Sequence, residues 1–213
     1  MTEPDTHGRP TSPVVGIIDQ LAYRFDGVFS RETVAAYVHE SYDLLAENAT
    51  ITGGLPVLAG KFARERLTAV ARLEGLTQVT VPDVLFLCVH NVGRSQMAAA
   101  LTHQLFDGRV HVRSAGSAPS EQIKPVVTKV KAEIGIELTE AFPKLLTDDI
   151  VRASDVIVTM GCGDACPVYP GKRSLDWGLP DPAGLPIEDI RPIRDQMETG
   201  VRGLLDELLP ANS

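Results

Sequence analysis

A cysteine and an arginine stand six positions apart in this sequence, separated by a short loop in the segment Cys88–Val89–His90–Asn91–Val92–Gly93–Arg94–Ser95. Residues 83–87, just before it, form a β-branched and aromatic run typical of a buried strand, and residues 96–101 are rich in helix formers. The loop is therefore expected to join a strand to a helix. Successive backbone N–H groups and the positive end of the helix dipole then point at one spot, which is suited to a tetrahedral oxyanion.

The side chains of this segment add a nucleophile and further donors. Arg94 offers a planar fork of N–H groups that matches two oxygens of an anion, and Ser95 can donate a hydrogen bond to the Cys88 sulfur. With these donors and a helix N-terminus nearby, we expect Cys88 to be a thiolate, the nucleophilic form of cysteine. The alternative is a buried cysteine that merely ends a strand, and the spacing to Arg94 and Ser95 disfavours it.

Several motifs, in the same order along the chain, resemble the low-molecular-weight protein tyrosine phosphatase superfamily, and the arsenate reductases within it most of all. The matching stretches are Cys88-Val-His-Asn-Val-Gly-Arg-Ser-Gln-Met-Ala98, Ser114-Ala-Gly-Ser117, Cys162-Gly-Asp-Ala-Cys-Pro167 and Asp176-Trp-Gly-Leu-Pro-Asp-Pro-Ala183. Together they place the resemblance over residues 82–209. It leaves the first 80 residues unexplained.

This resemblance implies that arsenate is the substrate and Cys88 its nucleophile. The oxyanion-binding residues implied are Val89, His90, Asn91, Val92, Gly93, Arg94 and Ser95. Asp181, followed by Pro182 and Ala183, matches the family's general acid, which protonates the oxygen that leaves arsenic.

The resemblance further implies that two more cysteines carry the electrons. Cys162 would attack the Cys88 sulfur, and Cys166 would then attack Cys162, which leaves a Cys162–Cys166 disulfide for thioredoxin to reduce. A four-residue spacing on a helical turn permits such a disulfide. No resident cofactor and no metal ion are implied.

Two departures from the family leave alternatives open. Cys162 and Cys166 are closer together than the resolving thiols of better-known members, so their order of action stays open. Ala99 replaces a glutamate that helps relatives to bind potassium, so we expect no such ion. The alternatives are a low-molecular-weight tyrosine phosphatase, a single-cysteine reductase coupled to mycothiol or glutaredoxin, and a redox-sensing or partner-binding protein. The phosphatase is disfavoured because Ala183 and Gly184 stand where aromatic residues usually frame a phosphotyrosine ring.

Composition narrows the class of protein. The 213 residues are 44% hydrophobic, and no apolar stretch reaches the ~18 residues that a membrane helix needs. The N-terminus lacks the basic and apolar regions of a signal peptide, so we expect a cytoplasmic protein without membrane contact. The formal charge of −8 argues against a nucleic-acid partner. Three cysteines, an odd number without zinc-finger spacing, fit a redox cycle better than a static disulfide framework or a metal site.

The second part of the chain, residues 82–213, alternates strand and helix patterns. Strands are expected near 83–88, 109–114, 155–159 and 172–176, and helices near 94–106, 124–135, 147–153 and 189–209. This order predicts an α/β fold with a four-stranded parallel sheet flanked by helices. Cys88, Cys162 and Asp181 each follow a predicted strand, so we expect them to meet at the edge where such folds bind ligands.

The first part of the chain has a different pattern. Residues 1–13 are rich in proline and polar residues and read as a disordered tail, and residues 14–76 predict a small three-helix domain. The first helix is expected to begin at Val14, the second to follow an N-cap at Ser30, and the third to begin at Pro56. Because three short helices bury few apolar residues among themselves, we expect them to form a docking or dimerisation element, such as a homodimer interface, rather than a catalytic domain.

Overall fold

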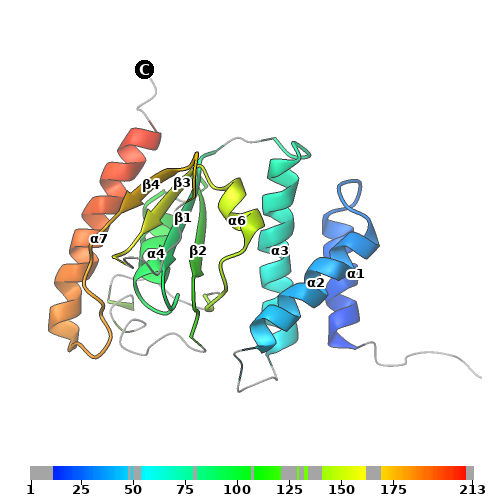
Figure 1. Ribbon diagram of the computed structural model, residues 1–213, viewed down its shortest axis with the longest axis horizontal. Coiled ribbons are helices and arrows are strands. Elements are labelled where there is room, and N and C mark those ends of the chain that lie inside the picture. The colour runs from blue at the N-terminus through cyan, green and yellow to red at the C-terminus, as the bar shows by residue number, and fades with distance from the viewer. Residues whose placement is uncertain are drawn as a thin grey trace, which may run out of the picture. The chain divides into compact units, whose positions relative to one another are not determined.

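The computed structural model describes residues 12–47, 49, 54–78, 81–106, 108–120, 129, 132–133, 141–161 and 169–209. The chain divides into two compact units, one up to Thr68 and the other from Ala69 onwards. Figure 1 shows both units, with the helices of the first in blue and cyan. The tail expected at residues 1–13 lies outside the described residues except for its last two, and so does most of the helix expected at 124–135.

Three helices form the N-terminal part, as the sequence predicted: α1 (Pro13–Arg24), α2 (Arg31–Ala46) and α3 (Leu55–Leu73). Proline at the first position of α1 suits a helix start, since the N–H that it lacks has no partner there. Ser30 caps α2 by accepting the Thr33 N–H at 3.1 Å. The helices enclose a small apolar core made of Ile18, Leu21, Phe25, Val34, Val38, Ala63 and Leu67.

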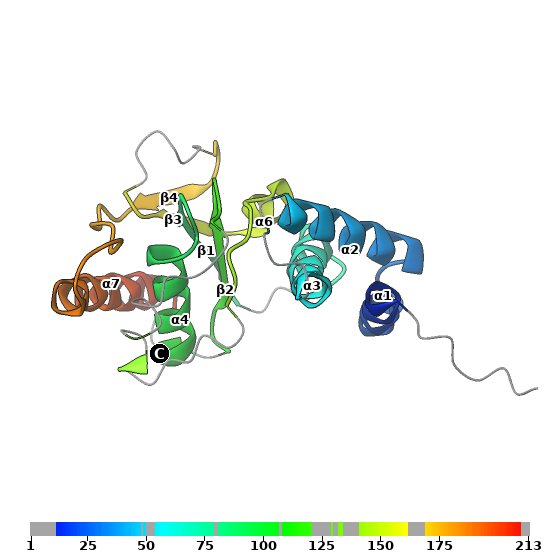
Figure 2. The ribbon, with the colours of Figure 1, turned by 90° about the horizontal axis from the view of Figure 1, so that it is seen from below.

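The second unit is built on a four-stranded, wholly parallel sheet in the order β2-β1-β3-β4. Its strands are β1 (Asp83–Cys88), β2 (His111–Gly116), β3 (Val156–Thr159) and β4 (Arg173–Asp176), and its helices are α4 (Arg94–Phe106), α6 (Asp148–Ala153) and α7 (Ile187–Leu208). Helices α4 and α7 pack together on one face, and α6 lies on the other (Figure 2). The predicted α/β fold is therefore confirmed. None of the described helices is long and apolar enough to cross a membrane.

Strand register brings the functional ends of the strands to one edge. Cys88 pairs with Gly116, and Thr159 pairs with Asp176, so the last residues of all four strands lie along the same border of the sheet. Strand β2 begins at His111, two residues later than expected, because Arg109 still belongs to the turn that follows α4. The whole strand thus lies two residues later than the expected 109–114, and it ends at Gly116, opposite Cys88.

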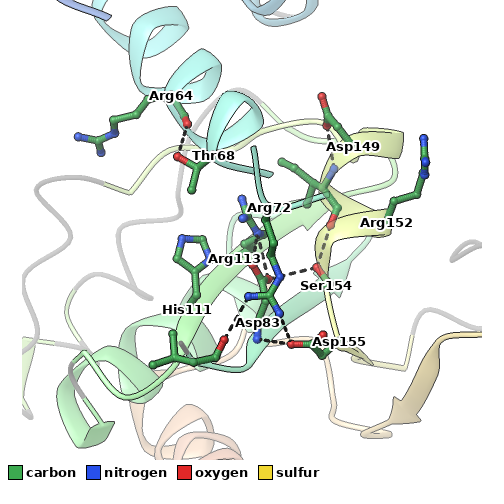
Figure 3. A network of polar contacts seen from close by, with 12 residues as sticks. Arg64, Thr68, Arg72, Asp83, His111, Arg113, Asp149, Arg152, Ser154 and Asp155 are labelled. Atoms are coloured by element: carbon green, nitrogen blue, oxygen red, sulfur yellow. Dashed lines mark hydrogen bonds and ion pairs between the residues drawn. The ribbon is translucent and has the colours of Figure 1, made fainter. Parts of the chain in front are cut away.

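A buried carboxylate organises the opposite border, where the strands begin (Figure 3). Asp83 is fully buried and accepts hydrogen bonds from Arg113 Nε at 2.9 and 3.0 Å and from Ser154 Oγ at 3.4 Å, while its Oδ2 lies 2.9 Å from His111 Nδ1. Asp155 accepts the Asp83 N–H at 2.8 Å. The starts of β1 and β2 and the residue before β3 are thus joined by one polar cluster, which fixes the register of the sheet.

Replacing Asp83 tests this cluster. Asp83→Ala removes the carboxylate that pairs with the buried Arg113 guanidinium, so we expect it to lower the free energy of unfolding by about 3–5 kcal/mol. Urea denaturation followed by Trp177 fluorescence reports on this unit, because that tryptophan packs against Phe86 and is the chain's only one. The double variant Asp83→Val/Arg113→Met, which removes both charges, should recover a large part of the loss. A loss below about 1 kcal/mol in Asp83→Ala would contradict this role.

Candidate active site

The loop after β1 turns its carbonyl groups outward. The carbonyl oxygens of Cys88, Val89 and His90 accept the N–H groups of Ser117 (3.2 Å), Ala118 (2.9 Å) and Ser120 (3.0 Å), respectively, in the segment that follows β2. In a trans peptide the N–H points opposite to the C=O. The N–H groups of residues 89–91 are therefore directed to the inner side of the loop, where the Cys88 side chain lies.

Asn91 closes the loop from within. Its backbone has φ of 51°, a left-handed conformation that asparagine tolerates better than most residues. Its buried side chain donates from Nδ2 to Ser95 Oγ at 2.8 Å, and its Oδ1 accepts from Gln96 Nε2 and from the Lys144 N–H, each at 3.0 Å. One amide thus ties the loop to the first turn of α4 and to the chain before α6.

Gly116 leaves room for the loop. A Cβ at this position would lie 2.6 Å from the Val89 carbonyl oxygen and 3.0 Å from the Asn91 Cβ. Real Cβ atoms do not approach a backbone oxygen so closely, and the contact is with backbone that cannot swing aside. The close packing of the loop on the end of β2 therefore requires glycine at 116.

Two donors converge on the sulfur of Cys88. The Asn91 N–H donates to Sγ at 3.3 Å, and Ser95 Oγ lies 2.9 Å from the same atom. Ser95 Oγ already accepts from Asn91, which leaves its own proton for the sulfur. The cysteine is buried at the N-terminal end of α4, whose dipole favours negative charge there. The sulfur therefore lies at the base of the loop with two hydrogen-bond donors directed at it.

Arg94 links the loop to the neighbouring strand ends. Its Nη1 donates to the carbonyl oxygen of Met160, just after β3, at 2.5 Å, and to that of Leu179, beyond β4, at 3.0 Å. Its Nη2 lies 3.9 Å from Asp181 Oδ2. These contacts hold the buried guanidinium beside the loop with donors left over for an anion.

Asp181 stands at the rim of a pocket that opens onto the cysteine. The pocket is lined by Cys88, His90, Val92, Gly93, Arg94, Asp181, Pro182 and Ala183. The Asp181 side chain is 53% exposed, and its Oδ1 accepts the Ala183 N–H at 2.9 Å. That bond orients the carboxylate while Oδ2 faces Arg94, so a carboxyl group, a guanidinium and a sulfur border one small space.

The structure thus brings together Cys88, Arg94, Ser95 and Asp181 with the backbone of the loop. Cys162 and Cys166 lie outside the described residues, which end at Gly161 on one side and resume at Tyr169. Within the described parts of the chain, no cluster of histidine, cysteine and carboxylate side chains is arranged to hold a metal ion.

Sequence reasoning missed the contacts that support the loop. Asn91 was predicted only as a backbone donor, although its side chain holds the loop closed. An asparagine in a tight loop is a signal for a left-handed residue, but nothing local identifies Phe142, whose carbonyl accepts from Gln96 at 2.9 Å. The carbonyls that hold Arg94 come from residues 66 and 85 positions further along the chain.

Comparison with known proteins places this site in a family. Residues 83–212 match the family described as "Low molecular weight phosphotyrosine protein phosphatase". A putative arsenate reductase of Halobacterium salinarum is 34% identical over 130 residues, which is 59% of this chain and 92% of that protein. The chain belongs to the arsenate reductase branch of the low-molecular-weight phosphotyrosine protein phosphatase family. Arsenate reductase 1 of Staphylococcus epidermidis is 33% identical over 122 residues, 55% of this chain and 91% of that protein.

Family members with the N-terminal helices are also known. Residues 16–71 match a family described as the N-terminal domain of protein-tyrosine-phosphatase-like proteins. A thioredoxin-dependent arsenate reductase of Corynebacterium glutamicum has a solved structure that is 45% identical, covering 93% of this chain and 97% of that one, with a TM-score of 0.80. The likeness therefore extends over both units, including the first 80 residues that the sequence motifs left unexplained.

Gly116→Ala tests the packing of the loop. Overpacking costs about 1–3 kcal/mol, so we expect phosphate or arsenate to bind about tenfold more weakly or worse. The measurement is the anion concentration that protects Cys88 from iodoacetamide, with the labelled peptide identified by mass spectrometry. Gly203→Ala is the matched control, because a Cβ there meets nothing within 4 Å. Unchanged protection in Gly116→Ala would show that the loop tolerates the added methyl group.

Proposed function

We propose that this protein reduces arsenate to arsenite and that thioredoxin restores its thiols. The observation that carries the proposal is the Cys88 sulfur at the base of a loop of inward N–H groups, beside a guanidinium held in place by two carbonyls. The likeness to the Corynebacterium glutamicum enzyme, over nearly the whole of both chains, supports arsenate as substrate and thioredoxin as reductant.

In the first step the loop binds arsenate and Cys88 attacks it. The N–H groups of residues 89–95 and the Arg94 guanidinium bind the oxygens of the tetrahedral anion, with the helix dipole of α4 adding to their attraction. The thiolate forms a sulfur–arsenic bond, and one arsenic–oxygen bond breaks. Donors fixed before the substrate arrives stabilise the charge that develops on these oxygens without having to reorganise.

The oxygen that leaves arsenic needs a proton, and we assign Asp181 as the donor. Its carboxyl group lines the same pocket as Cys88 and is oriented by the Ala183 N–H. Proton transfer to an arsenate hydroxyl group lets that oxygen leave as water, a far better leaving group than hydroxide. The carboxylate that remains then lies beside Arg94, whose positive charge stabilises it.

The second step moves two electrons from sulfur to arsenic. The Cys162 thiolate attacks the Cys88 sulfur, a sulfur–sulfur bond forms, and the electron pair of the sulfur–arsenic bond goes to arsenic, which leaves as arsenite. Cys166 then attacks Cys162 and frees Cys88. Thioredoxin reduces the resulting Cys162–Cys166 disulfide by the same exchange chemistry.

A coupled assay tests this function. Arsenate-dependent oxidation of NADPH, in the presence of thioredoxin and its reductase, should be abolished in Cys88→Ser, because a serine hydroxyl stays protonated at neutral pH. Arg94→Lys should be nearly as severe, since a point charge cannot replace the two-pronged guanidinium. Full arsenate reduction by Cys88→Ser would refute the proposal. Hydrolysis of a phenyl phosphate ester without arsenate reduction would favour a phosphatase instead.

Asp181→Asn tests the proton donor. We expect the first-turnover rate of arsenite formation to fall by about 10²–10⁴-fold, as is typical for loss of a general acid. Protection of Cys88 by phosphate should persist, because the loop that binds the anion is unchanged. Rapid quenching within the first turnover is the measurement, and Asp206→Asn, an exposed aspartate of α7, is the control. A first turnover as fast as in the unmodified protein would assign the proton to another group.

Variants of the other two cysteines test the relay. Cys166→Ser should reduce one arsenate and then stop as a Cys88–Cys162 disulfide, whereas Cys162→Ser should stop earlier, before arsenite is released. Mass mapping of the non-reduced chain identifies each trapped species. Repeated turnover by a Cys162→Ser/Cys166→Ser double variant with thioredoxin alone would eliminate the relay. Turnover restricted to a small thiol with a glutaredoxin-like partner would favour the single-cysteine alternative.

The N-terminal unit has no assigned part in this chemistry, and a homodimer through its helices stays a prediction. Tyr23 of α1 is 87% exposed and Val57 of α3 is 59% exposed, so this unit presents large apolar side chains to its surroundings. Sedimentation of the full chain and of a chain starting near Thr80 would decide: two monomeric species would refute the dimer. We also place the protein in the cytoplasm, where thioredoxin keeps thiols reduced.

A further inference from the structure

One peptide group next to the proposed relay is held at both of its ends by charged side chains. The carbonyl oxygen of Met160 accepts from Arg94 Nη1 at 2.5 Å. The N–H of Gly161, the other end of the same planar group, donates to Asp176 Oδ1 at 3.0 Å. A cation thus binds the negative end of the peptide dipole and a carboxylate binds its positive end, and both hydrogen bonds are of the strong, charge-assisted kind.

Asp176 is itself held in place. It is the last residue of β4 and pairs with Thr159, the last residue of β3. The Thr159 hydroxyl donates to the same Oδ1 at 2.6 Å, and the Trp177 N–H donates to the Thr159 carbonyl oxygen at 2.8 Å. Strand pairing and these two bonds leave the carboxylate little freedom to turn away from Gly161.

This peptide group determines where the chain leaves β3 in the direction of Cys162. Gly161 has φ of 64°, a left-handed conformation in which a residue with a side chain would be strained. The chain therefore changes direction at Gly161, immediately before the cysteine. Asp176 and Arg94 together fix the orientation of the Met160–Gly161 peptide, the last described peptide group before Cys162.

We propose that Asp176 is a positioning residue for the thiol exchange: by holding the Gly161 N–H, it sets the starting direction of the segment that carries Cys162. The inference rests on the proposed function, since it needs Cys162 to attack the Cys88 sulfur. Asp176 is not among the residues that line the pocket, so we expect no direct contact with the anion. Arg94 keeps a second carbonyl partner, that of Leu179, when Asp176 is changed, so we expect the effect on the second step of the reaction and not on anion binding.

The Met160–Gly161 peptide is also connected to the anion-binding site, because Arg94 donates a hydrogen bond to its carbonyl oxygen. The guanidinium that binds the anion also holds the Met160 carbonyl, so the arsenate site and the origin of the Cys162 segment share one fixed group. Thiol exchange requires the attacking sulfur to approach Cys88 along the sulfur–arsenic bond, and errors of 1 Å in such approaches cost rate steeply. A carboxylate outside the pocket thereby acts on the exchange rate.

The test compares three variants of the full chain. Asp176→Ala removes the acceptor, Asp176→Asn keeps an oxygen in the same place, and Thr159→Val removes the hydroxyl that holds it. We expect arsenite release in a single turnover without thioredoxin to slow by about 10- to 100-fold in Asp176→Ala, to slow less in Thr159→Val, and to recover most of its rate in Asp176→Asn. Protection of Cys88 from iodoacetamide by phosphate should be the same in all three.

The possible outcomes separate this inference from the function on which it rests. A rate of arsenite release in Asp176→Ala equal to that of the unmodified protein overturns it. Equal losses in Asp176→Ala and Asp176→Asn, or a loss of phosphate protection in Asp176→Ala, also overturn it, because they show a structural or anion-binding role. Cys162→Ser is measured alongside: arsenite release at full rate in that variant refutes the relay itself, whatever Asp176 does. Circular dichroism before and after heating checks that each variant is folded.

Discussion

The site depends on the way in which peptide groups of the loop after β1 are turned. A loop that binds an anion must direct its N–H groups inward, and its carbonyl groups then need partners on the outside. Residues 117–120 supply these partners for three successive carbonyls. These three hydrogen bonds form only if the loop backbone lies very close to the end of β2, which explains the glycine at position 116, opposite Cys88. The same tight loop places Asn91 in a left-handed conformation. The position of the Cys88 nucleophile and the inward direction of the loop N–H groups therefore both depend on the packing of the loop against the end of β2.

The two borders of the sheet have complementary tasks. At the border where the strands begin, the buried Asp83 carboxylate forms hydrogen bonds with Arg113, His111 and Ser154, and these contacts keep the strands in register. At the border where the strands end, Arg94 donates hydrogen bonds to the carbonyl oxygens of Met160 and Leu179 and so connects the segments after β3 and β4 to the loop. A shift of register at the first border would separate Gly116 from Cys88 and Thr159 from Asp176 at the second. The stability of the polar cluster is thus a condition for the geometry of the site.

Much of this could be predicted from sequence because the decisive signals are local. The strand, loop and helix around Cys88 lie within 24 consecutive residues, and their patterns predicted β1 and α4 with the bounds that the structure has. Asp181 was found through a short motif. The supporting contacts could not be found in this way, since Gly116, Lys144 and Met160 reach the loop from distant parts of the chain. Neither could the order of Cys162 and Cys166, because attack depends on sulfur positions that spacing alone does not determine.

The most direct test of the central claim is the stoichiometry of one turnover without an external reductant. The fully reduced chain is mixed with excess arsenate in the absence of thioredoxin, and arsenite and free thiols are counted in the same sample. If the chain itself supplies the two electrons, one arsenite appears per chain, two of its three thiols disappear, and Cys88 or its partners are found in a disulfide. Arsenite formed with all three thiols still free, or no arsenite at all, would contradict the account.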